Sequence, residues 1–106
     1  MDRVVTQREY TRVHVRWMIR RDMSEVLAVE NLSFDQPWPE KDFLDCLRKF
    51  SCIGMVAEHG EKVVGFMIYT LRKKKLCILN FAVHPEFRRC GIGSQMITKL
   101  ISKLAE

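Results

Sequence analysis

The sequence contains no long hydrophobic run. Its longest apolar stretches, at residues 63–69 and 76–83, are far shorter than the roughly 20 residues that a membrane-spanning helix needs. The N-terminal stretch "MDRVVTQREYTRVHVRW" mixes both signs of charge and lacks a continuous apolar block, so we expect no signal peptide. These absences predict neither a membrane partner nor a secreted protein.

The cysteine and histidine spacing also lacks the usual marks of a metal centre. The four cysteines form no CxxC pair, and the three histidines lie far apart in the sequence, which predicts neither a zinc site nor a redox site. Cys77 lies in an apolar run and Cys46 on a helical segment. These positions fit small core residues better than a disulfide framework, and we expect a reducing, cytoplasmic compartment.

No internal repeat, low-complexity stretch or linker divides the chain. Its 106 residues leave room for one domain with one modest core, and 47% hydrophobic with 29% charged residues is typical of a soluble globular protein. The 18 basic residues exceed the 13 acidic ones, which favours anionic partners in general. The only dense basic run, at residues 72–75, is typical of a solvated hairpin tip, so we expect no direct nucleic-acid partner.

The hydrophobic pattern predicts the elements of the first half of the chain. Residues 12–20 alternate apolar and polar side chains, which predicts a half-buried strand. Asp22 and Glu25 form a cap-like start for a helix through "SEVLAVENLSF". Pro39 suits the first turn of a second helix. The apolar face of this second helix is predicted from helical spacing and comprises Phe43, Leu44, Leu47 and Phe50.

In the second half, "CIGMVAE" and "VVGFMIYTL" flank the turn "HGEK" and predict a hairpin. The segment "LCILNFAV" is apolar on both faces, which is typical of a central strand, and Pro85 ends it. A final helix carries one apolar stripe, made of Met96, Ile97, Leu100, Ile101 and Leu104. The order β-α-α-β-β-β-α predicts an α/β (α+β) fold around a mainly antiparallel sheet.

The stretch "FRRCGIGSQM" lies between this two-sided apolar strand and the final helix. Free backbone N–H groups and the dipole at a helix start bind anions. Gly91 and Gly93 let a phosphate approach the backbone, and Arg88 and Arg89 can add charged hydrogen bonds, so the stretch suits a pyrophosphate. A glycine turn that only joins strand to helix fits the same letters. The GxGxxG and GK[ST] patterns are absent.

The segment "LNFAVHPEFRRCGIGSQMITKLI" resembles the acetyl-CoA-binding segment of the GNAT acyltransferase superfamily, whose signature is Arg/Gln-x-x-Gly-x-Gly/Ala at the start of the third helix. Together with "FDQPWPEKDF", this segment is most similar in sequence to ribosomal-protein-alanine N-acetyltransferases and related N-terminal acetyltransferases. The resemblance runs from about Val13 to the last residue. It implies α/β/α layers and acetyl-CoA as cosubstrate, without a metal.

Carried over residue by residue, the resemblance implies a cofactor site in two parts. The end of the fourth strand would hold the pantetheine and polarise the thioester carbonyl, through Phe81, Ala82 and Val83. The loop that wraps the pyrophosphate would comprise Arg88, Arg89, Cys90, Gly91, Ile92, Gly93 and Ser94. Cys90 falls at a variable position of the signature, which favours a filler of the loop over a chemical role for its thiol.

The resemblance also implies further β-α-β-β elements after the third helix, with the general base and the acid in them. Residues 1–106 are therefore expected to be the N-terminal portion of the domain, of low activity alone, with the fourth strand as an open edge that favours a homodimer or segment exchange. His84 and Glu58 are the upstream candidates for a base. A turn histidine and a solvated carboxylate fit them better, so we assign no catalytic residue.

The resemblance implies direct attack of an amine on the thioester, and a protein N-terminus is the favoured acceptor. At a reference pKa near 8, roughly one N-terminal amine in ten is neutral at pH 7, against fewer than one in a thousand for lysine. Two alternatives stay open. One is a non-catalytic module that binds acetyl-CoA or a protein partner, and the other is a small basic nucleic-acid binder.

Overall fold

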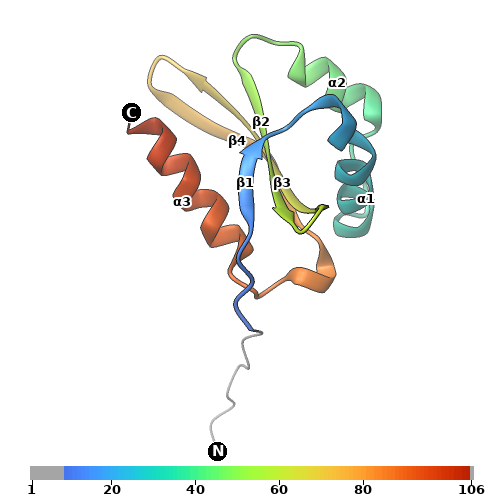
Figure 1. The fold of residues 1–106 in the computed structure, drawn as a ribbon. Coiled ribbons are helices and arrows are strands. Elements are labelled where there is room, and N and C mark those ends of the chain that lie inside the picture. Colours follow the sequence, from blue (N-terminus) through green and yellow to red (C-terminus); the bar gives the residue numbers. More distant parts are fainter. Residues whose placement is uncertain (1–8, 106) are drawn as a thin grey trace, which may run out of the picture.

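The computed structural model describes residues 9–105, and residues 1–8 of the N-terminal stretch lie outside that range. Its elements follow the predicted order (Figure 1). They are β1 (His14–Trp17), α1 (Met23–Ser33), α2 (Glu40–Leu47), β2 (Cys52–His59), β3 (Lys62–Arg72), β4 (Lys75–Val83) and α3 (Ile92–Leu104). Two short 3₁₀ helices, η1 (Arg20–Asp22) and η2 (Pro85–Phe87), precede α1 and α3.

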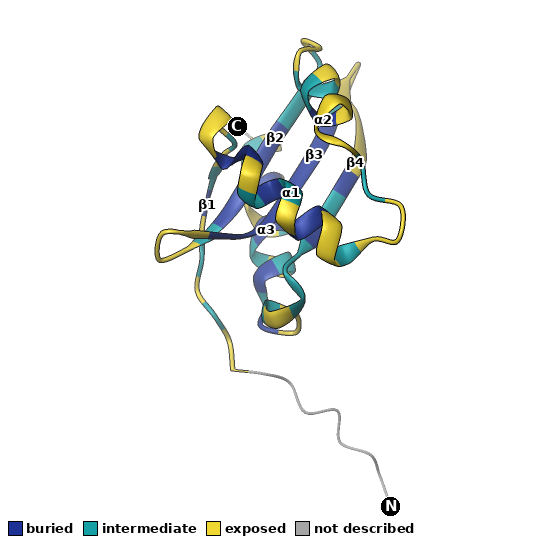
Figure 2. Cartoon of the chain, turned by 90° about the vertical axis from the view of Figure 1, so that its right-hand side faces the viewer, coloured by how far each residue is buried: buried dark blue, intermediate teal, exposed yellow. Residues whose placement is uncertain are grey.

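The strands form one antiparallel sheet in the order β1-β2-β3-β4. Helices α1 and α2 cover one face and α3 covers the other (Figure 1). Strand β3 lies between the two layers and is buried over residues 63–69, as the dark segment in Figure 2 shows. The α/β/α arrangement and the antiparallel sheet confirm the fold class predicted from the sequence.

Two hydrophobic clusters hold the layers together. On the α3 face, Met96 and Leu100 pack with Met55, Met67 and Tyr69. On the other face, residues of α1 and α2 pack against β2, β3 and β4, and this cluster includes Val26, Val29, Phe43, Phe66 and Ile68. Because both faces of β3 lose water in this way, the sheet is fixed between two helical layers.

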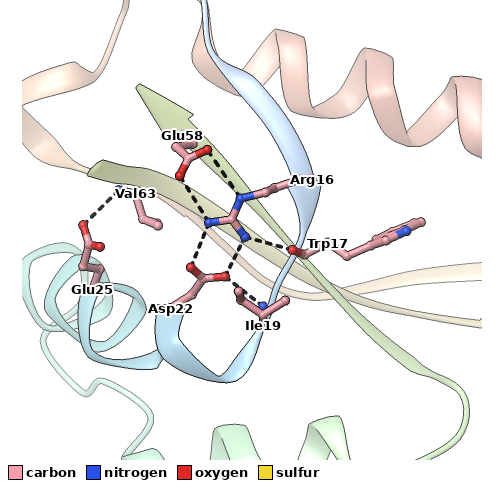
Figure 3. Close-up of polar contacts among 7 residues, drawn as sticks. All are labelled: Arg16, Trp17, Ile19, Asp22, Glu25, Glu58 and Val63. Atoms are coloured by element: carbon pink, nitrogen blue, oxygen red, sulfur yellow. Dashed lines mark hydrogen bonds and ion pairs between the residues drawn. The ribbon is translucent and has the colours of Figure 1, made fainter. Parts of the chain in front are cut away.

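Strand β1 is shorter than the sequence predicted, because the chain turns after Trp17. The Asp22 carboxylate accepts hydrogen bonds from the guanidinium of Arg16 at 2.8 and 2.9 Å and from the Ile19 backbone N–H at 2.8 Å (Figure 3). These bonds close the η1 turn, and they leave Trp17 and Ile19 exposed where the alternating pattern predicted burial. Asp22 therefore closes the turn before α1, and its side chain does not cap that helix.

The same polar network includes Glu58 at the end of β2. Glu58 accepts hydrogen bonds from Arg16 at 3.5 and 3.3 Å, so its side chain is paired rather than merely solvated as the sequence suggested. Hydrogen bonding to Arg16 lowers the pKa of Asp22, and hydrogen bonding to the Asp22 carboxylate is the main factor that raises the pKa of Arg16. Glu25 of α1 accepts a further bond from the Val63 backbone N–H at 2.9 Å (Figure 3). Glu25 thus joins the start of α1 to β3, and the Arg16 network joins the preceding turn to β1 and β2.

The burial predicted for three apolar side chains of the helical faces is wrong, because these side chains are exposed. Pro39 is the N-cap of α2 rather than a residue of its first turn, and the helix ends at Leu47, so Phe50 falls in the following turn and is fully exposed. In α3, Met96 and Leu100 are buried, but Ile101 and Leu104 lie on the exposed side. The helical period identified these elements, whereas their exact ends decided which side chains reach the core.

Strand β4 was predicted to be central, and in the described sheet it is the outermost strand. Residues 75–79 are exposed on both faces, including Leu76, Ile78 and Leu79 (Figure 2). Its other end is covered, because Asn80 and Ala82 are buried. The open edge agrees with the expectation drawn from the family resemblance. Within residues 9–105, no helix has both the length and the apolar character required to span a bilayer.

Candidate cofactor-binding site

A cleft of about 460 Å³ opens where the end of β4 meets the start of α3. Its walls are formed by Phe81, Ala82, Val83, Phe87, Arg88, Arg89, Gly91, Ile92, Gly93 and Ser94. The strand end and the glycine turn, which the family resemblance placed in one site, therefore line a single cavity. The bend at His84 and the η2 turn bring them together, since the His84 imidazole Nδ1 accepts from the Glu86 backbone N–H at 3.1 Å.

Two residues depart from the predicted set. Cys90 does not line the cleft: its side chain is buried in the cluster under α3, and its thiol contacts the Arg88 carbonyl at 3.5 Å. This position fits the filler role that the sequence favoured. Phe87 lines the cleft although the sequence analysis did not select it, and its place directly before the arginines was the only available signal.

Gly91 is the N-cap of α3 and adopts a left-handed conformation with φ of 82°. A Cβ atom at this position would lie 2.7 Å from the ring of Tyr10. Both observations require glycine here, because an L side chain is strained at this φ and has no space beside the ring. The residue sets the angle at which α3 leaves the loop.

The N-terminus of α3 offers bare backbone donors to the cleft. Its N-cap is a glycine, no side chain caps it among the described residues, and the first intrahelical bond runs from the Gln95 N–H to the Gly91 carbonyl. The preceding N–H groups of the first turn thus have no helical acceptor. A Cβ built on Gly93 would meet nothing nearer than the Phe81 ring edge at 3.6 Å, so the backbone is open to an anion, which the helix dipole favours.

The two arginines of the loop differ in their contacts. Arg88 donates to the Val83 carbonyl at 3.1 Å and to the Ser33 hydroxyl at 3.1 Å, so it joins the loop to β4 and α1. Arg89 has a φ of 65° and an exposed side chain, and within residues 9–105 no bond to its guanidinium is found. Arg89 is therefore the arginine whose charge is available to a bound anion.

The segment before β1 is held against the same loop by Gln95, a contact that sequence reasoning missed. The Gln95 side-chain amide donates to the Thr11 carbonyl at 2.6 Å and accepts from the Val13 N–H at 3.0 Å. Thr11 also donates its backbone N–H to the Cys90 carbonyl at 2.9 Å. These bonds fix Tyr10 over Gly91 and brace the turn from behind.

A second hollow of about 470 Å³ lies beside β4 and is lined by Glu30, Phe34, Asp35, Gln36, Trp38 and Asn80. Glu30 is buried, and both of its carboxylate oxygens are engaged: one accepts from the Asn80 amide at 2.9 Å and the other from the Trp38 N–H at 2.8 Å. Asn80 lines this hollow and its neighbour Phe81 lines the cleft, so both cavities border β4.

No group of three or more metal-ligating side chains occurs in the part of the chain that the structure describes. The cleft instead combines an open helix N-terminus, an arginine with no bonded partner among residues 9–105 and a strand end, which suits a negatively charged, extended ligand. The ring nitrogen of His84 accepts a hydrogen bond within the η2 turn, which agrees with the turn histidine that the sequence favoured.

Residues 17–106 match the model of the acetyltransferase (GNAT) family. The chain belongs to the GNAT family. No curated protein matches the sequence at a significant level. Solved GNAT structures nevertheless share the fold, and the comparison supports the layer arrangement seen in Figure 1.

Three of the similar structures show how far the likeness extends. The ribosomal-protein-S18-alanine N-acetyltransferase from Escherichia coli superposes with a TM-score of 0.80 and 22% identity, covering 88% of this GNAT chain and 59% of its own. Ard1 from Thermoplasma volcanium gives 0.76 and 28%, covering 85% and 62%. This chain thus spans about three fifths of the length of either protein. The PaiA N-acetyltransferase from Thermoplasma acidophilum, solved with coenzyme A, gives 0.78 and 12%, covering 90% and 73%.

Proposed function

We propose that the cleft between β4 and α3 binds acetyl-CoA. One observation carries the proposal: the bare N-terminus of α3, the end of β4 and Arg89, whose guanidinium has no partner among the described residues, line one cavity. The N–H groups of Ile92, Gly93 and Ser94 would hold the pyrophosphate, with charge from Arg89. Backbone groups of Phe81 to Val83 would hold the pantetheine arm. The coenzyme A bound by the PaiA N-acetyltransferase, which shares the fold, supports this assignment.

We propose that the family reaction is transfer of the acetyl group to an amine. Bound acetyl-CoA supplies an activated thioester. The neutral amine forms a new N–C bond, the C–S bond breaks, and the proton that the nitrogen loses balances the departing thiolate. Since an N-terminal amine is neutral far more often than lysine at pH 7, a protein N-terminus asks less of a base. The name of the ribosomal-protein-S18-alanine N-acetyltransferase, which shares the fold, supports the same acceptor.

The hollow beside β4 is the proposed approach of the acceptor. It borders β4, as the cleft does, and it is lined by Glu30 and Asp35, which carry carboxyl groups. A negatively charged hollow attracts an ammonium group. Glu30 already accepts two hydrogen bonds, so its role here is to hold Asn80 and Trp38 in place, and no catalytic residue is assigned.

The second candidate function is a non-catalytic acetyl-CoA-binding or protein-interaction module. For this chain alone, the hydrogen bonds of Glu30 and Glu58 favour the non-catalytic module. Both carboxylates already accept hydrogen bonds from other residues, so neither is available as a base. We also propose that the 106-residue chain self-associates through β4, whose exposed Ile78 and Leu79 lie on the outermost strand of the sheet formed by residues 9–105. The cytoplasmic location stays a prediction from the sequence.

An acetyl-transfer assay separates the two functions. The chain is incubated with isotopically labelled acetyl-CoA and a peptide that begins with alanine, and the product is located by mass spectrometry. Label on the peptide α-amine supports the transferase, and a peptide with a blocked N-terminus and a free lysine is the matched control. Equal labelling of both peptides would contradict the N-terminal acceptor. Binding of acetyl-CoA without any transfer would favour the non-catalytic module.

A further inference from the structure

A pair of thiols that does not belong to the cofactor cleft flanks the turn between α2 and β2. The Sγ atoms of Cys46 and Cys52 are 3.0 Å apart, and both cysteines are free. Cys46 is on the last turn of α2 and Cys52 is the first residue of β2. The sequence spacing predicted four separate thiols and no redox site, because these two do not form a CxxC pair. The turn that follows Leu47 brings them into contact.

The surroundings give the two thiols different properties. Burial and the contact with Cys52 raise the pKa of the Cys46 thiol to about 11, so Cys46 is a poor first nucleophile at neutral pH. Cys52 lines a cavity of about 630 Å³ together with Arg20, Arg48 and Glu40. The cavity gives a small molecule a route to Cys52, and its two guanidinium groups outnumber the one carboxylate and attract carboxylates.

We propose that Cys46 and Cys52 form a reversible redox site, oxidised to an intramolecular disulfide by small carboxylated disulfides of the glutathione type. The Cys52 thiolate attacks one sulfur of the glutathione disulfide, the S–S bond breaks, and one glutathione leaves as thiolate. Cys46 then loses its proton and attacks the Cys52 sulfur of the mixed disulfide, and the second glutathione leaves. The protein dithiol is oxidised, the small disulfide is reduced to two thiols, and the protons pass to water or the leaving thiolates.

Because the two thiols are close together, the mixed disulfide should be converted quickly to the intramolecular disulfide and should not accumulate. The 3.0 Å separation of the two sulfur atoms keeps the resolving thiol in place, so ring closure competes with free glutathione as an intramolecular reaction. Cys77 is the internal contrast: it is exposed on β4, and no thiol contact to it is found within residues 9–105. Oxidation thus ties the end of α2 to the start of β2 and fixes the turn that presents Phe50.

The test is an oxidative titration of the whole chain with glutathione disulfide, followed by alkylation and tryptic mapping. Cleavage after the basic residues at 41, 48, 49 and 62 separates the two cysteines into peptides 42–48 and 50–62. We expect these peptides to become linked, with loss of both thiols from alkylation, while Cys77 carries glutathione. Addition of dithiothreitol should restore both thiols. Free Cys46 and Cys52 after Cys77 has reacted, or separate glutathione adducts on both, would overturn the proposal.

Two variants sharpen the assignment of roles. In Cys46→Ser, glutathione should accumulate on Cys52, because the resolving thiol is gone. In Cys52→Ser, Cys46 should be alkylated only after unfolding. Cys46 is half-buried, and it does not line the cavity that Cys52 lines. Circular dichroism checks that each variant is folded, and Cys77→Ser in the otherwise intact chain is the matched control, which should still form the 42–48 to 50–62 link. The same glutathione yield in both variants would contradict the proposed order of attack.

Discussion

The guanidinium of Arg16 in β1 donates two hydrogen bonds of 2.8 and 2.9 Å to the buried carboxylate of Asp22 (Figure 3). The Asp22 side chain is only 3% exposed. A third bond from the Ile19 N–H completes the turn between β1 and α1. A buried ion pair of this kind is costly to break from one side, because the remaining charge stays out of water.

Replacement of Arg16 by methionine should therefore destabilise the fold by on the order of 3 kcal/mol. Asp22 would keep its charge in a buried position with one backbone donor left. Urea unfolding followed by circular dichroism measures the change. The matched control is Lys41→Met, which breaks the exposed pair of Lys41 and Asp45 in α2 and should leave the urea midpoint unchanged. Equal effects of the two substitutions would contradict the structural role of the buried pair.

Stability should also depend on pH through Asp22. Hydrogen bonding to Arg16 lowers the pKa of this carboxyl group in the folded state. Its contribution is therefore fully present above the unfolded value of about 4 and is lost as the pH falls through the lower folded value. Chemical unfolding across acid pH should show a loss of stability that Asp22→Asn reduces. A parallel decline in both proteins would mean that other groups carry the acid sensitivity.

Gly91 should tolerate alanine poorly. The left-handed φ costs about 1–2 kcal/mol for a residue with a Cβ, and this atom would meet the Tyr10 ring at 2.7 Å. Removal of the ring in the double variant Tyr10→Ala/Gly91→Ala should recover the part that arises from the ring contact and leave the backbone strain. Thermal unfolding of the two single variants and the double variant measures this coupling. Simple additivity would show that Tyr10 does not rest on the turn.

The exposed edge of β4 should make the 106-residue chain self-associate. Ile78→Lys places a charge on that edge and should shift the chain toward the monomer in light scattering at micromolar concentration. Leu32→Lys is the control, because Leu32 is also exposed but lies on α1. A monomeric parent chain, or an identical shift in both variants, would argue against association through β4.

The sequence predicted the features that depend on local order. Strand, arginines and glycines follow one another directly, so the stretch itself predicted an anion-binding turn at Gly91 and Gly93, and the family resemblance added Phe81 to Val83, which line the same cleft. The spacing could not show Gln95 holding Thr11, or Glu30 holding Asn80, because these partners meet only after distant segments pack. Burial at the ends of β1, α2 and α3 was missed for the same reason: it depends on where the turns begin.

Titration calorimetry with acetyl-CoA tests the central claim most directly. The parent chain should show saturable binding, and Gly93→Glu should abolish it, because a carboxylate would occupy the open space before Phe81 and repel the pyrophosphate. Thr98→Glu introduces the same charge on an exposed position of the same helix outside the cleft, and it should bind as the parent does. Absence of binding to the folded parent chain, or unchanged binding by Gly93→Glu, would contradict the assignment of the cleft.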